Sequence, residues 1–143
     1  MSTVRDMIRK KGNGVFAITP DGTVYEALAI LAKHNIGALL VMDGQSVAGI
    51  ISERDCVRKI DLEGRDSKNT KVRDVMTANV ISVDASKDLE ECMTIMINKN
   101  IRHLPVYDGI ELLGLISIRD VLKEVVDVQQ SLIAQLEQYI KGD

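Results

Sequence analysis

The chain contains the stretch GIISERD at residues 49–55, and a second version of it, GLISIRD, at residues 114–120, about 65 residues later. The same spacing relates Asn35-Ile36 to Asn100-Ile101 and Asp43-Gly44 to Asp108-Gly109. The opening Val4-Arg5-Asp6-Met7 is echoed at residues 72–76 in a shifted register. Two copies of one unit predict a pseudo-twofold molecule with a central cleft lined by both copies, and we expect the function to lie there.

Length and composition set the broad class of the molecule. The chain has 143 residues, of which 45% are hydrophobic, enough for one compact domain or two half-domains with a shared core. A net charge of -3 gives no electrostatic reason to expect nucleic acid or an anionic membrane as a partner. The apolar runs are strand-sized and no signal-peptide pattern opens the chain, which predicts a cytoplasmic protein.

Each copy has the pattern strand, helix, strand, strand, helix. The first copy predicts strands at 15–18, 37–42 and 47–51, a helix from Thr23 to about Asn35, and a helix from Ser52 to about Ile60. Thr23 and Glu26 have the spacing of a capping box, and Asp43-Gly44 predicts a hairpin turn.

The second copy predicts the same elements, with strands at 80–83, 104–107 and 112–116 and a helix at 88–99. Its final helix continues from Ser117 to Ile140 without glycine or proline. The predicted organisation is therefore an α/β (α+β) chain with copies at 1–60 and 71–126, a polar linker at 61–70 and a helical extension at 127–143. The apolar stripe of that extension needs cover, and a helix from a second chain would supply it.

The duplicated Ser-x-Arg-Asp motif comprises Ser52, Arg54 and Asp55 in one copy and Ser117, Arg119 and Asp120 in the other. One interpretation is purely structural, because Ser-x-x-Asp is also a good helix cap and the helix dipole favours acidic residues in the first turn. Retention of Ser, Arg and Asp in both copies favours a shared chemical role instead. Helix N–H groups and arginine suit phosphate, while a carboxylate accepts hydrogen bonds from the two hydroxyls of a ribose.

Taken together, the motifs resemble a stand-alone pair of cystathionine-β-synthase (CBS) domains, also called a Bateman module, over nearly the whole chain. The resemblance is carried by the two strand-then-Ser-x-x-Asp segments, by Ile101-Arg102-His103-Leu104-Pro105-Val106, and by the Val-Arg-Asp openings of the copies. It implies two β-α-β-β-α repeats related by a pseudo-twofold, with sheets packed face to face. It also implies that adenosine-containing ligands, namely AMP, ADP, ATP or NAD(H), and less readily S-adenosylmethionine, occupy clefts between the repeats, and that two pairs form a dimer.

The resemblance assigns roles to positions that match the family's motifs. Asp55 and Asp120 match the ribose-binding carboxylate, and Ser52 and Ser117 match a hydroxyl near sugar or phosphate. The positions that match the backbone around adenine are Ile36, Gly37, Ala38 and Leu39 in one copy and Ile101, Arg102, His103, Leu104 and Pro105 in the other. The positions that match the cleft lining at the end of each first strand are Ile18, Thr19 and Pro20, and Ile81, Ser82 and Val83.

The copies differ at these positions, so the resemblance implies two clefts that are not equivalent. Gly37-Ala38 stands where the second copy has Arg102-His103, basic residues that in some family members meet phosphate. Leu40 stands where the second copy has Pro105. We therefore expect that a ligand fills one cleft in preference to the other.

Other reactive side chains have structural interpretations. His34 lies at a predicted helix end, where a cation suits the dipole, and His103 is equally well explained as a packed histidine. Residues 10–14 predict a mobile basic loop, with contact to phosphate as the alternative. Cys56 and Cys92 share no metal-ligand spacing and fall in predicted helices, which favours buried free thiols without a catalytic role.

Three functions are compatible with these features. The first is a non-catalytic regulatory module that binds an adenine nucleotide and signals to a protein partner. The second is a ligand-independent dimeric scaffold that recruits a protein through its long last helix. The third is a small hydrolase or transferase, for which the sequence offers no general base oriented toward either serine.

Overall fold

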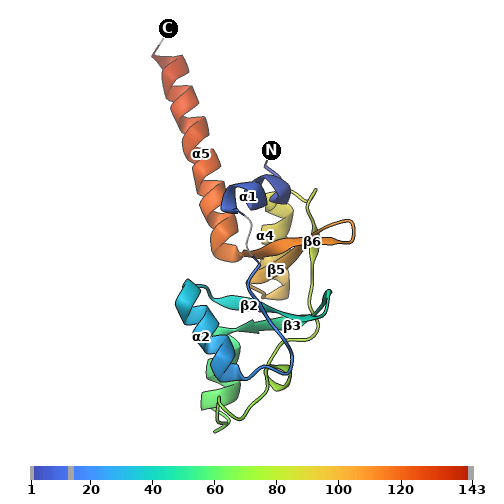
Figure 1. Ribbon diagram of the computed structural model, residues 1–143. Coiled ribbons are helices and arrows are strands. Elements are labelled where there is room, and N and C mark those ends of the chain that lie inside the picture. Colours follow the sequence, from blue (N-terminus) through green and yellow to red (C-terminus); the bar gives the residue numbers. More distant parts are fainter. Residues whose placement is uncertain (1, 13–14, 142–143) are drawn as a thin grey trace. The chain divides into compact units, whose positions relative to one another are not determined.

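The computed structural model describes residues 2–12 and 15–141, and the chain folds into two compact units (Figure 1). The first-copy unit is formed by residues 14–81, and the second-copy unit by residues 1–13 together with 82–143. The boundaries of these units differ from those of the two sequence copies, which were placed at residues 1–60 and 71–126. The first residues of the chain fold with the second copy, and residues 61–81, which include the opening of the second copy, fold with the first.

The first-copy unit is a three-stranded sheet with order β1-β2-β3, in which β1 is parallel to β2 and β2 is antiparallel to β3. Its elements are β1 (Ala17–Ile18), α2 (Val24–His34), β2 (Ala38–Asp43), β3 (Ser46–Ser52), α3 (Glu53–Cys56), a π-helical turn (Val57–Asp61) and a 3-10 turn (Val72–Asp74). The predicted helix after Ser52 is therefore α-helical for four residues only and continues to Asp61 as a π turn.

Local sequence explains the ends of these elements. Thr23 caps α2 by accepting a hydrogen bond from the backbone N–H of Glu26 at 3.1 Å, which is one half of the predicted capping box. Asn35 ends the helix in the left-handed region with φ 52°. The predicted hairpin turn contains Gly44 with φ 63°, a conformation that glycine adopts at little cost.

The second-copy unit repeats this plan with sheet order β4-β5-β6. Its elements are β4 (Val83–Asp84), α4 (Leu89–Lys99), β5 (His103–Asp108), β6 (Glu111–Ser117) and α5 (Ile118–Ile140), preceded by α1 (Val4–Lys11). The prediction of a strand at 80–83 was wrong by about three residues, because Val83 is the first residue of β4 and pairs with Val106 of β5.

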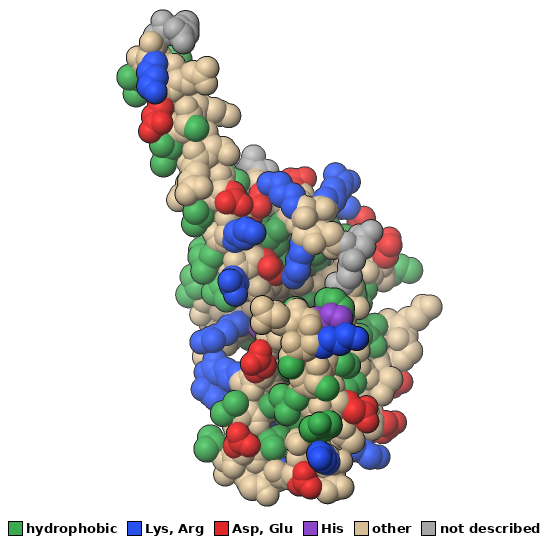
Figure 2. Space-filling model, turned by 60° about the vertical axis from the view of Figure 1, so that its left-hand side comes forward, with side chains coloured by type: hydrophobic (Ala, Val, Ile, Leu, Met, Phe, Trp, Pro, Cys, Tyr) green, Lys and Arg blue, Asp and Glu red, His purple; other side chains and the backbone are tan. Residues whose placement is uncertain are grey.

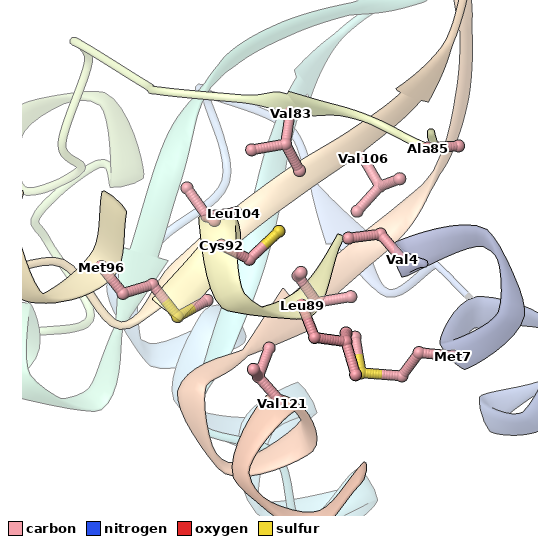
Figure 3. Close-up of a cluster of buried hydrophobic side chains, with 11 residues drawn as sticks. Val4, Met7, Val83, Ala85, Leu89, Cys92, Met96, Leu104, Val106 and Val121 are labelled. Carbon is pink, nitrogen blue, oxygen red and sulfur yellow. The ribbon is translucent and has the colours of Figure 1, made fainter. Parts of the chain in front are cut away.

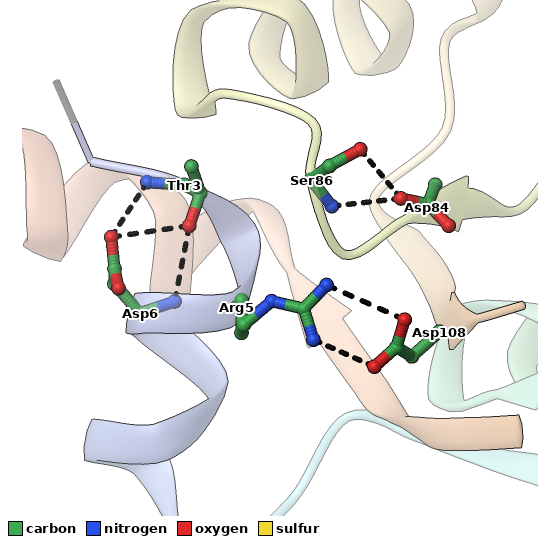
Figure 4. A network of polar contacts seen from close by, with 6 residues as sticks. All are labelled: Thr3, Arg5, Asp6, Asp84, Ser86 and Asp108. Atoms are coloured by element: carbon green, nitrogen blue, oxygen red, sulfur yellow. Dashed lines mark hydrogen bonds and ion pairs between the residues drawn. The ribbon is translucent and has the colours of Figure 1, made fainter.

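The helix α1 was not predicted from the sequence. Thr3 and Asp6 form a capping box at its start, with the Thr3 Oγ1 accepting from the Asp6 N–H at 3.3 Å (Figure 4). Val4 and Met7 point into the apolar cluster of the second-copy unit, beside Val106 and Leu89 (Figure 3). These two side chains are almost fully buried. A helix this short would be only marginally stable alone, and it is stabilised because its apolar side chains are buried against residues far along the chain.

An ion pair also connects α1 to the sheet of the second-copy unit. The Arg5 guanidinium donates to the Asp108 carboxylate at the end of β5, with an Nη1 to Oδ2 distance of 2.7 Å (Figure 4). Lys10 and Lys11 are the last residues of this helix, so the expectation of a loop at residues 10–14 was wrong for these two positions. Asn13 and Gly14 lie outside the described residues.

In the first-copy unit, the segment 72–77 docks on β3 in a comparable way. Val72 and Val75 are fully buried, and Ile50 and Thr77 exchange backbone hydrogen bonds of 3.0 and 2.8 Å. Each Val-Arg-Asp opening therefore packs against the unit that contains the other copy's strands. The valine of each opening, Val4 or Val72, is fully buried in that position.

The second half of α5 has little contact with the rest of its unit. Val121 is fully buried and Val125 packs against the apolar cluster, whereas Leu132, Ile133 and Leu136 are 52–55% exposed. Figure 2 shows hydrophobic side chains along the projecting part of this helix. The exposed stripe agrees with the predicted need for cover.

Candidate functional site

The first Ser-x-x-Asp motif forms the junction between β3 and α3. Ser52 is extended, its hydroxyl accepts from the Asp55 N–H at 3.1 Å, and its own N–H donates to Asp55 Oδ2 at 3.1 Å. The two side chains therefore form a reciprocal capping box, and both are half-buried.

The second motif has the same geometry between β6 and α5. The Ser117 hydroxyl accepts from the Asp120 N–H at 3.0 Å, and the Ser117 N–H donates to Asp120 Oδ2 at 2.8 Å. The structural interpretation of the motif is thus correct as far as it goes, since both pairs cap helices. Thr3 and Asp6, with Arg5 between them, form a third such capping box at the start of α1. A hydroxyl-x-Arg-Asp sequence can therefore serve as a helix cap at a position that does not follow a strand.

The beginning of the neighbouring strand lies beside each motif. Ala38 pairs with Ser52 across the sheet, and the N–H of Glu53 donates to the carbonyl oxygen of Gly37 at 3.0 Å. In the second-copy unit, His103 pairs with Ser117, and the N–H of Ile118 donates to the Arg102 carbonyl at 2.8 Å. Each unit therefore brings together the serine, the aspartate and the strand-edge backbone that sequence reasoning singled out.

These strand starts differ in burial. Leu39, Leu104 and Pro105 are buried, while Ile36 and Ile101 are half-buried. The side chains of Arg54, Arg102 and Arg119 are exposed, and Gly37 is exposed as well. His103 is half-buried and makes an interaction within the protein.

Within the first-copy unit, the predicted site residues at the end of β1 do not lie beside Ser52 and Asp55. Ile18 pairs with Val41, three residues along β2 from Ala38, and the chain then leads away through Thr19 and Pro20. Because β1 is parallel to β2, the residues nearest the Ser52 end of the sheet are those that precede β1. Phe16 precedes β1 and was not among the predicted site residues. Its side chain is 39% exposed, and its ring stacks on that of His34 with a centroid distance of 4.0 Å.

The register also changes which residues correspond between the copies. Val83 pairs with Val106 as Ile18 pairs with Val41, so the counterparts of Ile18, Thr19 and Pro20 are Val83, Asp84 and Ala85. The predicted set Ile81, Ser82 and Val83 is therefore two residues out of register with the first copy. Ile81 corresponds to Phe16, and it is similarly exposed at 37%.

The two aspartates have different electrostatic surroundings. The Lys11 ammonium at the end of α1 lies 2.7 Å from Asp120 Oδ2 and also donates to the carbonyl of Leu115. Burial raises the pKa of the Asp120 carboxyl, but hydrogen bonds from Lys11 and Ser117 and the charge of Lys11 outweigh it and leave that pKa below its usual value. Asp120 is consequently ionised at neutral pH and can accept hydrogen bonds.

The cation near Asp55 is more distant. Lys59 places its Nζ 3.9 Å from Asp55 Oδ1 and donates instead to the carbonyl oxygen of Val75, at 2.8 Å. Asp55 Oδ2 accepts only from Ser52 among the described residues, through its N–H and its hydroxyl. The two sites therefore differ in the distance of the nearest lysine ammonium from the aspartate. They also differ in sequence, since Gly37-Ala38 in the first copy corresponds to Arg102-His103 in the second.

The remaining reactive groups have structural positions. Cys56 and Cys92 are buried free thiols, as predicted, and burial raises the pKa of each to about 11, with nearby carboxylates adding to the effect. The thiols stay protonated at neutral pH, which makes them poor nucleophiles. Among the described residues, no cluster of three His, Cys, Asp or Glu side chains could hold a metal ion, and no helix is long and apolar enough to cross a membrane.

Known proteins share both the sequence and the architecture. The sequence model of the CBS domain family matches this chain twice, at residues 4–62 and 72–127. The mitochondrial CBS domain-containing protein CBSX3 of Arabidopsis thaliana is 38% identical over 99% of this chain and 73% of its own length. The crystal structure of the CBS domain protein NE2398 is 41% identical, with a TM-score of 0.83 over 87% of this chain and 98% of that one.

A more distant structure contains adenosine compounds. The CBS domain pair of protein MJ0100, in complex with 5'-methylthioadenosine and S-adenosyl-L-methionine, has a TM-score of 0.77 at 22% identity over 89% of this chain and 98% of that one, which is a likeness of fold. The duplicated motif, the two similar sheets and the two matched segments lead to one conclusion: this chain belongs to the CBS domain family, as a pair of CBS domains with a long C-terminal helix.

Proposed function

We propose that the chain is a non-catalytic regulatory module that binds an adenosine-containing ligand, AMP, ADP, ATP or NAD(H), at its Ser-x-x-Asp motifs. The observation that carries the proposal is the recurrence, in both units, of a half-buried carboxylate at a strand-to-helix junction beside the start of the sheet's middle strand, β2 or β5. Such a carboxylate accepts hydrogen bonds from ribose hydroxyls while its serine keeps the helix capped.

Each part of the proposed site has a chemical role. Asp55 and Asp120 bind the ribose, and Ser52 and Ser117 contact sugar or phosphate. The backbone at residues 36–39 and 101–105 borders the adenine, and the exposed guanidiniums of Arg54 and Arg119 meet phosphate. The complex of MJ0100 supports the ligand class, because a protein of this fold holds two adenosine compounds. S-adenosylmethionine remains the weaker candidate here.

The proposed regulation follows from linkage. A ligand that binds one arrangement of the protein more tightly shifts the population toward it, by no more than its differential affinity. A protein partner would sense that shift. We also propose that the chain is a homodimer through its exposed α5 stripe, and that it acts in the cytoplasm, a reducing compartment that suits its two free thiols.

A thermal-shift panel with AMP, ADP, ATP, NAD, NADH and S-adenosylmethionine is the first test of ligand binding. A ligand at about a hundred times its dissociation constant adds roughly 2.7 kcal/mol of stability to the state that binds it. No shift with any of the six would favour the second candidate function, a ligand-independent dimeric scaffold, for which the exposed α5 stripe is the supporting observation.

Substitution of the two aspartates tests the site itself. Asp55→Ala and Asp120→Ala should each weaken titration-calorimetry affinity for the best ligand at one site, by about tenfold or more for the loss of hydrogen bonds to a charged acceptor. Their stability should fall by only about 1 kcal/mol, because Ser52 and Ser117 still cap.

Asp88→Ala is the matched control for this experiment. Asp88 caps α4 with a carboxylate that accepts from the Glu91 N–H at 2.8 Å, in the same unit as Asp120 but outside the motif. This control should lose similar stability and keep its ligand affinity. Unchanged affinity in both motif variants would rule out the ribose role of the aspartates.

A further inference from the structure

The clearest difference between the two motifs is that Lys11 engages Asp120. This lysine ends α1, and its Nζ is 2.7 Å from Asp120 Oδ2 and 3.0 Å from the carbonyl oxygen of Leu115. Lys11 belongs to neither Ser-x-x-Asp motif and reaches the site only because α1 folds with the second copy. Asp55 has no cation within hydrogen-bond distance among the residues that the structure describes.

The Lys11 contact can open without loss of α1. The helix is held independently by the buried Val4 and Met7, by Arg5 with Asp108, and by Lys10, whose Nζ is 2.7 Å from the buried Glu124. The Lys11 and Asp120 side chains are 43% and 27% exposed, so water can replace each as the other's partner. An ion pair this exposed contributes little to the stability of the fold.

A ligand that uses Asp120 Oδ2 changes the partner of Lys11. This oxygen already accepts from the Lys11 ammonium and from the Ser117 N–H, so a ribose hydroxyl that donates to it competes with the ammonium. An anionic ligand offers the displaced ammonium a new partner in its phosphate, whereas a neutral adenosine offers none. A cationic adenosine derivative is repelled as well.

We propose, on the basis of the function proposed above, that Lys11 determines ligand charge preference at the Asp120 site and selects phosphorylated adenosines over neutral or cationic ones. Among the described residues, the lysine nearest to Asp55 is Lys59, which lies 3.9 Å from Oδ1 and donates to the carbonyl oxygen of Val75 instead, so the Asp55 site discriminates less. The helix α1 thereby links the first residues of the chain to recognition at the second copy.

The test is calorimetric titration of AMP and adenosine into the full chain in an Asp55→Ala background, which leaves the Asp120 site. The ratio of AMP affinity to adenosine affinity should fall about fivefold in Lys11→Gln, the size that one partly exposed charge pair can supply, and Lys11→Arg should keep it. Arg9→Gln is the matched control, because it removes the same charge from an exposed position of the same helix.

Four outcomes decide the matter. A drop confined to Lys11→Gln supports the inference. An unchanged ratio in Lys11→Gln, or an equal drop in Arg9→Gln, overturns it and leaves the proposed function standing. Failure of both compounds to bind the unsubstituted chain overturns the proposed function, and the inference falls with it.

Discussion

Gly49 lies where the backbone of Thr77 crosses the last strand of the first-copy unit. A Cβ atom at this position would come within 2.6 Å of the Thr77 carbonyl oxygen and 2.8 Å of the Met76 sulfur. The corresponding Gly114 faces Ile8 instead, and its Cβ would lie 3.3 Å from the flexible Cδ1 of that side chain. Two glycines in equivalent positions of the repeat therefore meet different constraints.

We expect Gly49→Ala to destabilise the chain by about 1–3 kcal/mol, because the docked segment 72–77 must shift to make room. Urea unfolding followed by circular dichroism measures the loss. Gly114→Ala serves as the control and should cost clearly less, since a side-chain terminus can move where a backbone cannot. Equal losses in the two variants would show that the close approach at Gly49 is not what requires a glycine.

At the scale of elements, α5 combines two roles. Its first turn contains the capping aspartate and its buried Val121 belongs to the core, whereas the turns after Val125 are exposed. Leu122, Val126, Gln129, Ile133, Leu136 and Ile140 follow one another at alternating intervals of four and three residues. That spacing places them on one face and is typical of a helix that pairs with another helix.

The double variant Ile133→Glu with Leu136→Glu should convert the proposed dimer to monomer, because four charges would face one another in the helix pair. Sedimentation velocity at micromolar concentration measures the change. Ser131→Glu with Gln138→Glu adds the same charge outside the stripe and should remain dimeric. Truncation after Val126 completes the series, and a dimer that survived it would place the interface elsewhere in the molecule.

At the scale of the whole molecule, turns, helix caps and most strands and helices could be predicted from the sequence. The packing of segments that are far apart in the chain could not. The hairpins at Asp43-Gly44 and Asp108-Gly109 follow from turn residues alone, and the strands and helices beside them were placed within one or two residues. The reciprocal caps at Ser52 and Ser117 were likewise visible in the sequence, since each is completed within four residues.

The failures depend on contacts between residues far apart in the chain. The helix α1 has few apolar positions, and Val4 and Met7 are stabilising only against a core formed about 80 residues later. The start of β4 is fixed by pairing with β5, which no local pattern around residue 80 encodes. Lys11 could be connected to Asp120 only once α1 was placed, because 109 residues separate them.

The central claim is that the capping aspartates also hold the ribose of an adenosine ligand. The most direct measurement is a crystal structure of the chain grown with millimolar AMP, the anionic ligand that Lys11 favours. We predict ribose hydroxyls within hydrogen-bond distance of Asp55 or Asp120, with the strand-edge backbone beside the adenine. If both carboxylates contact only their serines and protein lysines, with AMP absent or bound elsewhere, the claim is contradicted.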